Sequence, residues 1–233
     1  MQNSSLSISL GLPPFSQNTN YDNFIIPGAL AVLDFSDSST ITWDNTGTPS
    51  ISSIKYKNNL SLSATATDKT KQPVGDSING KVAAKFDTFD DYLQFSSRLT
   101  TVRTVIWIGR LHLTVDHFND SWLGLTDDVG VYCGAGPTYA LLDTAFTPSL
   151  WAGTWYLNGS AVTPTTTAAP IGSNFSLIMQ TTSNGTCDYI SRDRDFTARG
   201  LPIVLGEIQL SSQTFTESEL LGFNTNLRTK WNF

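Results

Sequence analysis

Three Asn-Gly pairs constrain this chain more than any other feature, because each stands between two stretches with the composition of β-strands. The pairs are Asn79-Gly80, Asn158-Gly159 and Asn184-Gly185. A two-residue hairpin turn needs positive φ at both central residues, and Asn and Gly adopt such angles at little cost. The pairs therefore predict three tight hairpins and antiparallel pairing between the flanking strands.

Most of the remaining chain also reads as short strands separated by turns. The expected strands are 29–34, 40–43, 82–86, 102–115, 122–125, 130–133, 139–142 and 175–180. Residues 102–115 form the longest, and because they are apolar on both faces through Ile108, we expect a central strand whose far end emerges toward solvent. Residues 45–77 have little periodicity and are expected to form surface loops with small strands between them. The pattern predicts an all-β, two-sheet antiparallel sandwich.

The C-terminal stretch predicts one strand followed by one helix. Residues 206–210 alternate, which places Glu207 and Gln209 on a polar face opposite two apolar residues, as in a half-buried strand. Thr216 and Glu219 have capping-box spacing, and Phe215 is placed for a hydrophobic staple with the first turn. Three apolar side chains then fall near one helix face: Leu220, Leu227 and Trp231. We therefore expect an amphipathic helix to close the chain.

The length of 233 residues suits a single β-sandwich domain. We place this domain at residues 29–233 and an extended N-terminal arm at residues 1–28, which are rich in Ser and Asn and contain three prolines. Two interpretations of the arm remain open. It is either a tether that docks on a partner, or a leader or edge strand that lies on the domain.

Charge and hydropathy exclude several classes of partner. The formal charge of −6 and the pI near 4.7 argue against nucleic acid and against anionic membranes, since both attract Lys and Arg. No run approaches the about 20 apolar residues of a membrane span, and the N-terminus lacks the basic opening of a secretory signal. Cys133 and Cys187 are expected to be two buried thiols, although a disulfide between them stays open.

Three segments together resemble a known family. Residues 78–93, with Ile78-Asn79-Gly80 and Phe86-Asp87 followed by Asp91-Tyr92-Leu93, are similar to the "nGkpavrFdG…dyL" segment of concanavalin A-like lectin/glucanase (laminin G-like) jelly rolls. Residues 155–159 resemble their "w…vNG" hairpin, and residues 206–231 resemble the ending of single-domain members from bacteriophage and bacteria. The resemblance implies two stacked antiparallel sheets with a curved face, and glycans often bind to that face or to the loops at its rim.

The sequence offers no set of catalytic residues. Glucanases of this fold carry paired carboxylates on alternate residues of one strand, and no such motif occurs here. Glu207 is either a lone acid or a solvated strand residue. His112 and His117 are expected on opposite faces of a strand end, which argues against a two-histidine metal site. We therefore predict a non-enzymatic protein without a catalytic residue or a bound cofactor.

Candidate ligand-binding residues lie near the expected loops. The aromatic candidates are Tyr132, Tyr139, Trp151 and Trp155, which are alternatively parts of an ordinary core. Arg192 and Arg194, in the densest charge cluster, could present guanidinium groups to an acidic sugar or a protein partner, or could be satisfied by neighbouring Asp. Acidic clusters could also bind calcium. The alternative is that their Asp side chains bond to their own backbone in turns. The clusters are Asp34 with Asp37, Asp87 with Asp90 and Asp91, and Asp127 with Asp128.

These observations predict a virion structural protein of a bacteriophage, either a capsid decoration or a tail component. Its lectin-like domain would be attached to other virion proteins through the N-terminal arm, and we expect a homo-oligomer made in the host cytoplasm without a signal peptide. Binding of host-surface glycans is part of this hypothesis. A free-standing carbohydrate-binding module is the alternative, and a glycan-cleaving enzyme that depends on Glu207 is a minor one.

Overall fold

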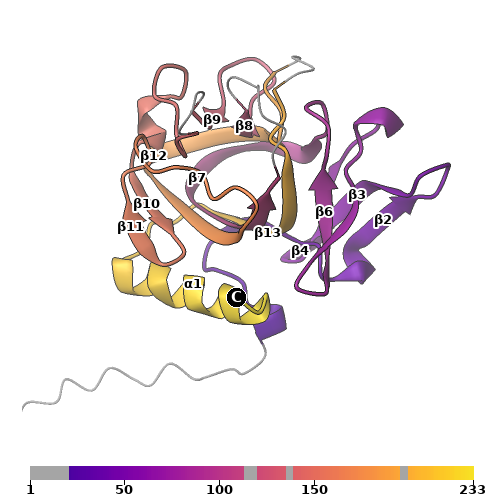
Figure 1. Cartoon of the computed structure of the whole chain (residues 1–233), viewed down its shortest axis with the longest axis horizontal. Helices are drawn as coiled ribbons and strands as arrows, with labels where there is room; N and C mark the ends of the chain where they lie inside the picture. The colour runs from indigo at the N-terminus through magenta and orange to yellow at the C-terminus, as the bar shows by residue number, and fades with distance from the viewer. Residues whose placement is uncertain (1–20, 113–119, 135–138, 195–198) are drawn as a thin grey trace, which may run out of the picture.

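A computed structural model describes residues 21–112, 120–134, 139–194 and 199–233 of the chain. Within these ranges the regular structure is almost entirely antiparallel β-strand, and one α-helix, α1 (Glu217–Lys230), follows the last strand (Figure 1). The prediction of an antiparallel all-β chain with a C-terminal helix is confirmed.

The strands are β1 (Ala29–Asp34), β2 (Ile41–Asp44), β3 (Ser50–Tyr56), β4 (Asn59–Thr65), β5 (Val74–Ile78), β6 (Lys81–Phe86), β7 (Leu93–Leu111), β8 (Ser121–Gly124), β9 (Val131–Tyr132), β10 (Thr154–Leu157), β11 (Ser160–Val162), β12 (Asn174–Ile190) and β13 (Ile203–Ser211). Short 3-10 turns are η1 (Tyr21–Asn23), η2 (Ser38–Thr40), η3 (Lys69–Lys71) and η4 (Ser149–Trp151).

The strands form one hydrogen-bonded network in which six of them close into a ring. The order around the ring is β13, β6, β5, β3, β4, β7 and back to β13, and every pairing in it is antiparallel. Strand β7 allows the closure because its first part pairs with β4 at Gln94 and Phe95, whereas residues 104–111 pair with β13. Strand β12 follows the other edge of β7 and carries β10 and β11. The sequence did not predict this closed ring.

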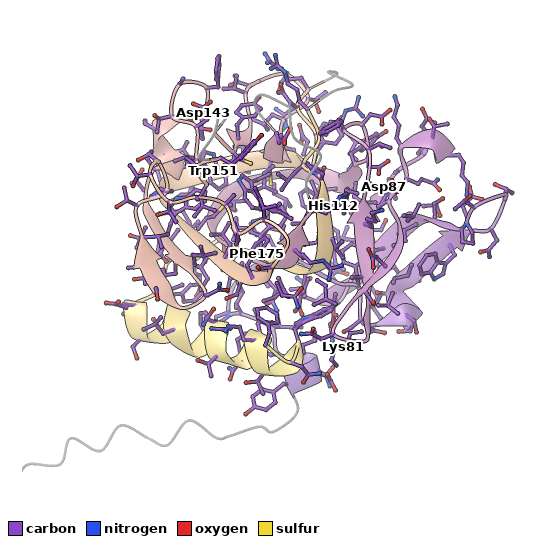
Figure 2. The ribbon with its side chains drawn as sticks, viewed as in Figure 1. Lys81, Asp87, His112, Asp143, Trp151 and Phe175 are labelled. Carbon is purple, nitrogen blue, oxygen red and sulfur yellow. The ribbon has the colours of Figure 1, made fainter. Side chains whose placement is uncertain are left out.

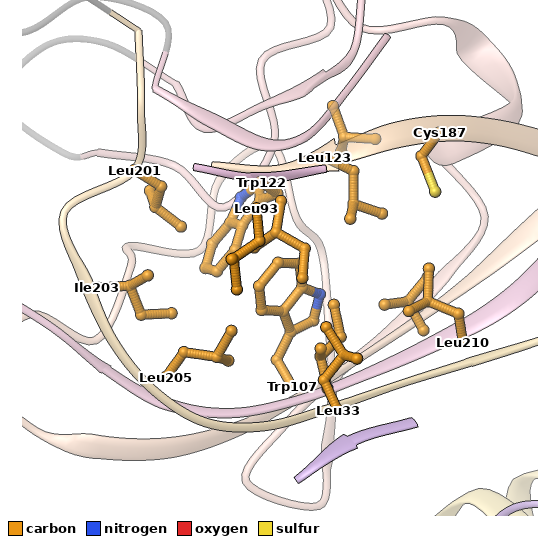
Figure 3. Close-up of a cluster of buried hydrophobic side chains, with 14 of the residues drawn as sticks. Leu33, Leu93, Trp107, Trp122, Leu123, Cys187, Leu201, Ile203, Leu205 and Leu210 are labelled. Atoms are coloured by element: carbon orange, nitrogen blue, oxygen red, sulfur yellow. The ribbon is translucent and has the colours of Figure 1, made fainter. Parts of the chain in front are cut away.

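Aromatic rings fill the centre of the molecule. The Trp107 ring centroid lies 5.4 Å from that of Trp122 (Figure 3). The Trp122 ring centroid lies 6.1 Å from that of Phe175, and both contacts are edge-on. Strand β7 is apolar on both faces because each face packs against a hydrophobic cluster. Val105 and Trp107 point into this core, whereas Ile106 and Ile108 point into a second cluster on the opposite side. The prediction that β7 is central is therefore confirmed. Its expected far end, from residue 113 onward, lies outside the described residues.

Helix α1 covers the outer face of the β7–β12–β13 sheet and forms a second apolar cluster with it. The predicted capping box is present, because the Thr216 hydroxyl and the Glu219 carboxylate each bind the other residue's main-chain N–H. Leu220, Leu227 and Trp231 are buried as predicted. In the part of the chain that is described, no helix is both long and apolar enough to cross a membrane.

Two of the three predicted hairpins are confirmed. Strands β5 and β6 meet at Asn79-Gly80, with φ values of 48° and 81°, and β10 and β11 meet at Asn158-Gly159, with values of 53° and 84°. The third is wrong, because β12 runs without reversal through Asn184-Gly185 and Gly185 pairs with Val102 of β7. Glycine is needed there for a different reason: a Cβ would lie 2.7 Å from the Trp151 ring.

Residues 45–77 were predicted to be surface loops with small strands between them, and the structure has more strand here than this prediction allowed. They contain the seven-residue strands β3 and β4 together with β5. Ile51, Ile54 and Tyr56 of β3 are fully buried against the main core. Ser, Thr and Lys dominate the composition and mostly occupy partly or fully exposed positions, although Ser50 is buried. The few apolar residues between them fill the inner side of the ring.

The two cysteines are separate buried thiols, as expected. Burial raises the pKa of Cys133 and of Cys187, with nearby Asp carboxylates adding to the effect. Both side chains therefore stay protonated and unreactive at neutral pH.

Candidate functional site

One group of charged and aromatic side chains gathers at the end of the molecule that carries β8 and β9. We call it the rim cluster. It consists of Tyr92, Arg98, Tyr132, Asp188, Tyr189, Arg192, Asp193, Arg194 and Arg199.

The rim cluster is built on residues 191–194, which follow β12 and cross over β8. The Arg194 N–H donates to the carbonyl of Leu125 at 3.1 Å. The crossing is close, because a Cβ on Gly124 would lie 1.6 Å from the Arg192 carbonyl oxygen. Glycine at position 124 thus allows this loop to lie directly on the strand.

Asp193 is the centre of the loop, and its side chain is fully buried. One carboxylate oxygen accepts from the Tyr132 hydroxyl at 2.5 Å and from Arg194 Nε at 3.0 Å, and the other accepts from Arg199 Nη1 at 2.9 Å. Burial and the Asp193 carboxylate raise the pKa of Tyr132 to about 12. The hypothesis that neighbouring Asp side chains pair with the arginines of this loop is therefore confirmed for Asp193 and Arg194.

Arg192 lies over two tyrosine rings. Its guanidinium carbon is 4.3 Å from the centroid of Tyr92 and 5.0 Å from that of Tyr189, and the two rings meet edge to face at 5.6 Å. Arg192 Nε also donates to the Arg194 carbonyl at 2.8 Å. These contacts hold a planar cation in a fixed orientation between aromatic faces.

Arg98 links two carboxylates beside this stack. Its guanidinium binds Asp188 through Nε at 3.0 Å and Nη2 at 2.8 Å, and Asp127 through Nη2 at 2.7 Å. Burial opposes ionisation of Asp188, but hydrogen bonds from Arg98 and Thr126 lower its pKa overall. The Asp188 carboxylate is therefore charged at neutral pH and holds Arg98 in place.

The structure brings together three of the six candidate ligand residues, namely Tyr132, Arg192 and Arg194. Tyr132 and Trp151 are 1% and 3% exposed, so neither offers the exposed aromatic platform that was expected for a sugar. Trp155 is also buried and donates its ring N–H to the Trp151 carbonyl at 2.8 Å. Tyr139 is half-buried, has a φ of 38° and packs against the main core rather than the rim cluster.

The acidic candidates for calcium have local partners in the structure. Asp37 caps η2, and Asp91 accepts the main-chain N–H groups of Asp87 and Thr88, which is the turn chemistry considered above. Asp127 is paired with Arg98. Among the described residues, no group of three or more His, Cys, Asp or Glu side chains is arranged to hold a metal ion. His117 lies outside the described residues.

A second polar site lies at the α1 end of the molecule and was not predicted. We call it the lysine–carboxylate cluster: Asp34, Lys57, Glu207 and Lys230. Asp34 and Glu207 face each other on β1 and β13, and Lys230 at the end of α1 places its Nζ between them. This Nζ is 2.5 Å from Asp34 Oδ2 and 2.6 Å from Glu207 Oε2, and all three side chains are at most 1% exposed.

Further donors complete the hydrogen bonding of both carboxylates. Glu207 Oε2 also accepts from Trp231 Nε1 at 2.9 Å, and its Oε1 accepts from Gln209 Nε2 at 2.6 Å. Asp34 Oδ1 accepts from the Ser36 N–H at 3.1 Å and the Ser36 hydroxyl at 2.6 Å. Lys57 Nζ donates to Asp34 Oδ2 at 2.7 Å.

The two carboxylates differ in their tendency to hold a proton. Burial opposes ionisation of Asp34, but Lys230 and Lys57 hold its pKa below the usual range. Burial is the main cause that raises the pKa of Glu207, and the negative charge of Asp34 raises it further. Burial also opposes the charge of Lys230, yet Glu207 and Asp34 raise its pKa. Glu207 is thus the member of the cluster that most readily carries an added proton.

Residues 21–28 lie on the domain beside this cluster. Gln209 binds them at two points, because its side chain accepts from the Ile26 N–H at 2.9 Å and donates to the Phe24 carbonyl at 3.0 Å. The Phe24 ring also contacts Phe223 of α1 at 5.6 Å. This part of the predicted arm is therefore packed against the fold, and residues 1–20 lie outside the described residues.

A polar pocket of about 290 Å³ opens next to the cluster. It is lined by Asp22, Asn23, Asp34, Ser36, Asp37, Lys57 and Lys81. Figure 2 shows Lys81 near α1, whereas Asp143 and Trp151 lie toward the opposite end of the molecule. Asp34 alone belongs both to this pocket and to the contact with Lys230, so it connects the buried charges with solvent.

The interpretation of Glu207 as a solvated strand residue is wrong, because its side chain is 1% exposed. Each of its carboxylate oxygens accepts a hydrogen bond from a protein donor, Gln209 or Lys230. The polar face of β13 is buried because α1 and residues 21–28 cover it. Lys230 stands three positions after Leu227, and this spacing places it on the apolar face of α1, where a buried cation could have been expected from the sequence.

No protein-family model matches the chain, and no curated protein matches it at a significant level.

Proposed function

We propose that this chain is a non-enzymatic structural protein of a bacteriophage virion, attached as a capsid decoration or a tail component. Its fold is then a variant of the concanavalin A-like jelly-roll sandwich in which part of the sheet closes into a ring. The chain associates with copies of itself and with other virion proteins through the N-terminal arm. The resemblance of residues 78–93, 155–159 and 206–231 to that family supports this proposal.

The observation that carries the proposal is that the two ends of the molecule differ, with the N-terminal segment at one end and loops at the other. Tyr21, the first described residue, lies in η1 beside α1, while β8 and β9 lie at the other end (Figure 1). Residues 21–28 are tied to β13 and α1 through Gln209 and Phe24. An attachment segment at one end and loops at the other suit a domain that is fixed to a particle and displays its far end.

Mass spectrometry of purified virions tests the proposal. Particles of the phage that encodes this chain are expected to contain it in fixed stoichiometry with the major capsid or tail proteins after density-gradient purification. A chain lacking residues 1–20 is expected to be missing from the particles, although it should fold normally. Virions that lack the full-length chain would refute the proposal.

A second candidate function, carbohydrate binding, is favoured by one observation in the rim cluster. The Arg192 guanidinium is fixed over Tyr92 and Tyr189, with Arg98 and Arg194 nearby, so planar cations and aromatic rings stand together. Guanidinium groups bind carboxylates and sulfates with defined geometry, and here the buried Tyr92 and Tyr189 rings hold the Arg192 guanidinium in place. An acidic glycan on the host surface is the ligand that fits this combination.

A glycan array measured with and without calcium tests this candidate. We expect binding to acidic glycans and at least a tenfold loss for Arg192→Gln. Arg110→Gln serves as the matched control, because within the described part of the chain Arg110 on β7 forms a long ion pair of 3.9 Å with Asp76, outside the rim cluster. An array without signal under both conditions, or equal binding by the two variants, would exclude the rim cluster as a glycan site.

A further inference from the structure

We infer that the chain forms an internal covalent bond, an isopeptide between the Lys230 side-chain nitrogen and the side-chain carboxyl carbon of Asp34, promoted by Glu207. The inference rests on the lysine–carboxylate cluster and is independent of the proposed function.

The arrangement places a nucleophile, an electrophile and a proton carrier in direct contact. Lys230 Nζ lies 2.5 Å from Asp34 Oδ2 and 2.6 Å from Glu207 Oε2, and the three side chains are buried together. Their elements hold them there, since β1 and β13 pair Asp34 with Glu207 and α1 ends at Lys230. Groups fixed in this way react as if at very high concentration, because the entropy of bringing them together has already been lost during folding.

Burial opposes the charged forms of all three groups, although their mutual pairing keeps Asp34 ionised and Lys230 protonated before the reaction. Moving an ammonium and a carboxylate out of water costs much free energy, whereas moving a neutral amine and a neutral carboxylic acid out of water costs less. Burial and the neighbouring Asp34 charge raise the pKa of Glu207, so this side chain can accept a proton from Lys230 and pass it to Asp34. Trp231 and Gln209 hold the Glu207 carboxyl group in position through the whole transfer.

The bond-forming step is a condensation that releases water. Glu207 takes one proton from the Lys230 ammonium and delivers it to Asp34 Oδ2. The free amine lone pair then attacks the Asp34 carboxyl carbon, and a second proton moves from the nitrogen through Glu207 to Oδ2. The carbon–Oδ2 bond breaks, Oδ2 leaves as water, and Oδ1 becomes the amide oxygen. One ammonium and one carboxylate give one amide and one water, with no change in oxidation state.

Other groups around Asp34 suit this chemistry. The Ser36 N–H and hydroxyl both point at Oδ1, where negative charge develops in the tetrahedral intermediate. Lys57 donates to Oδ2, the oxygen that leaves. Because Asp34 also lines the polar pocket, the released water has a route to solvent.

Lys230, rather than Lys57, is the reacting lysine. Both contact Asp34 Oδ2, but the Lys57 side chain is 12% exposed and also donates to the Asp22 carbonyl, so it is held at the pocket wall. Lys230 is completely buried and shares its nitrogen with Glu207. The product would join the first strand to the last helix and enclose residues 34–230 in a covalent loop.

Intact-mass measurement of the denatured full-length chain tests the inference. We expect a mass lower than the sequence mass by one water molecule. We also expect a tryptic product in which the peptide containing Asp34 is linked to the peptide containing Lys230, with no cleavage after Lys230. A chain of full sequence mass that is cleaved after Lys230, or a water loss that maps elsewhere, would overturn the inference.

Two variants and one control identify the roles of the residues. Lys230→Arg keeps the positive charge but lacks a nucleophilic amine, and Glu207→Gln removes the proton carrier, so both are expected to show the full mass. Lys57→Arg is the matched control and should still lose water. Water loss that persists at Asp34 in Lys230→Arg would contradict the assignment. If Glu207→Gln does not fold, the wild-type mass and peptide map still decide the question.

Discussion

Replacing Lys230 with methionine is expected to lower the free energy of unfolding by about 3 kcal/mol or more, because the variant can form neither the ion pairs of Lys230 nor the cross-link to Asp34. The methionine side chain has a similar length but leaves two buried carboxylates facing each other across β1 and β13 without the ammonium between them. Removing one member of a buried ion pair is far more costly than removing an exposed pair, because the remaining charge is then unpaired in a medium of low polarity. Urea unfolding followed by tryptophan fluorescence measures the change.

Lys81→Met is the matched control for this prediction. Lys81 pairs with Asp22 at 3.3 Å, and the two side chains are 29% and 69% exposed. An exposed pair of this kind contributes below about 1 kcal/mol, so the control should unfold close to the wild-type midpoint. Equal effects of the two substitutions would show that the lysine–carboxylate cluster does not stabilise the fold.

The Lys230→Met variant should also depend on pH in a defined direction. In the variant Asp34 keeps its carboxylate, so burial and this negative charge raise the pKa of Glu207, and loss of Lys230 removes a positive charge that lowers it. A carboxyl group whose folded pKa lies above its unfolded pKa destabilises the fold as pH rises through the folded pKa. The variant is therefore expected to be most stable near pH 4 and to lose stability toward pH 8. A second change, Glu207→Gln, should recover part of the loss at pH 8.

Local sequence patterns predicted the elements whose geometry is decided by a few neighbouring residues. The Thr216–Glu219 capping box and the turns at Asn79-Gly80 and Asn158-Gly159 all depend on contacts within four residues. Asn184-Gly185 has the same local signature, but its glycine is required by a distant ring, that of Trp151. An Asn-Gly pair therefore predicts a hairpin only when no residue distant in the sequence packs against the glycine and requires it for lack of space.

The sites were harder to predict because they depend on contacts that no local pattern encodes. Asp34 and Lys230 are separated by 196 positions, and their contact requires the first strand, the last strand and α1 to be in place. The charge cluster around Arg192 was visible in the sequence because its members lie close together in the chain. The burial of Tyr132 was not visible, since its partner Asp193 lies 61 positions away.

A Gly124→Ala substitution is expected to displace the loop at residues 191–194. The new Cβ would lie 1.6 Å from the Arg192 carbonyl oxygen and 2.7 Å from its carbonyl carbon, so main chain must move rather than a flexible side chain. Overpacking of this kind costs about 3 kcal/mol or more when the obstructing atoms belong to the backbone. The movement would also separate Arg192 from the Tyr92 and Tyr189 rings, so any binding of acidic glycans should be lost together with the stability.

Gly222→Ala is the control for Gly124→Ala, because it makes the same chemical change at a site with open space. Nothing lies within 4 Å of a Cβ at Gly222, which stands inside α1, and alanine favours a helix by up to about 1 kcal/mol over glycine. The two substitutions should therefore shift the thermal midpoint in opposite directions, and Gly222→Ala should leave glycan binding unchanged. If Gly124→Ala unfolds at the wild-type temperature, the loop does not rest on β8 as closely as the structure shows, and the rim cluster has no fixed geometry to recognise a ligand.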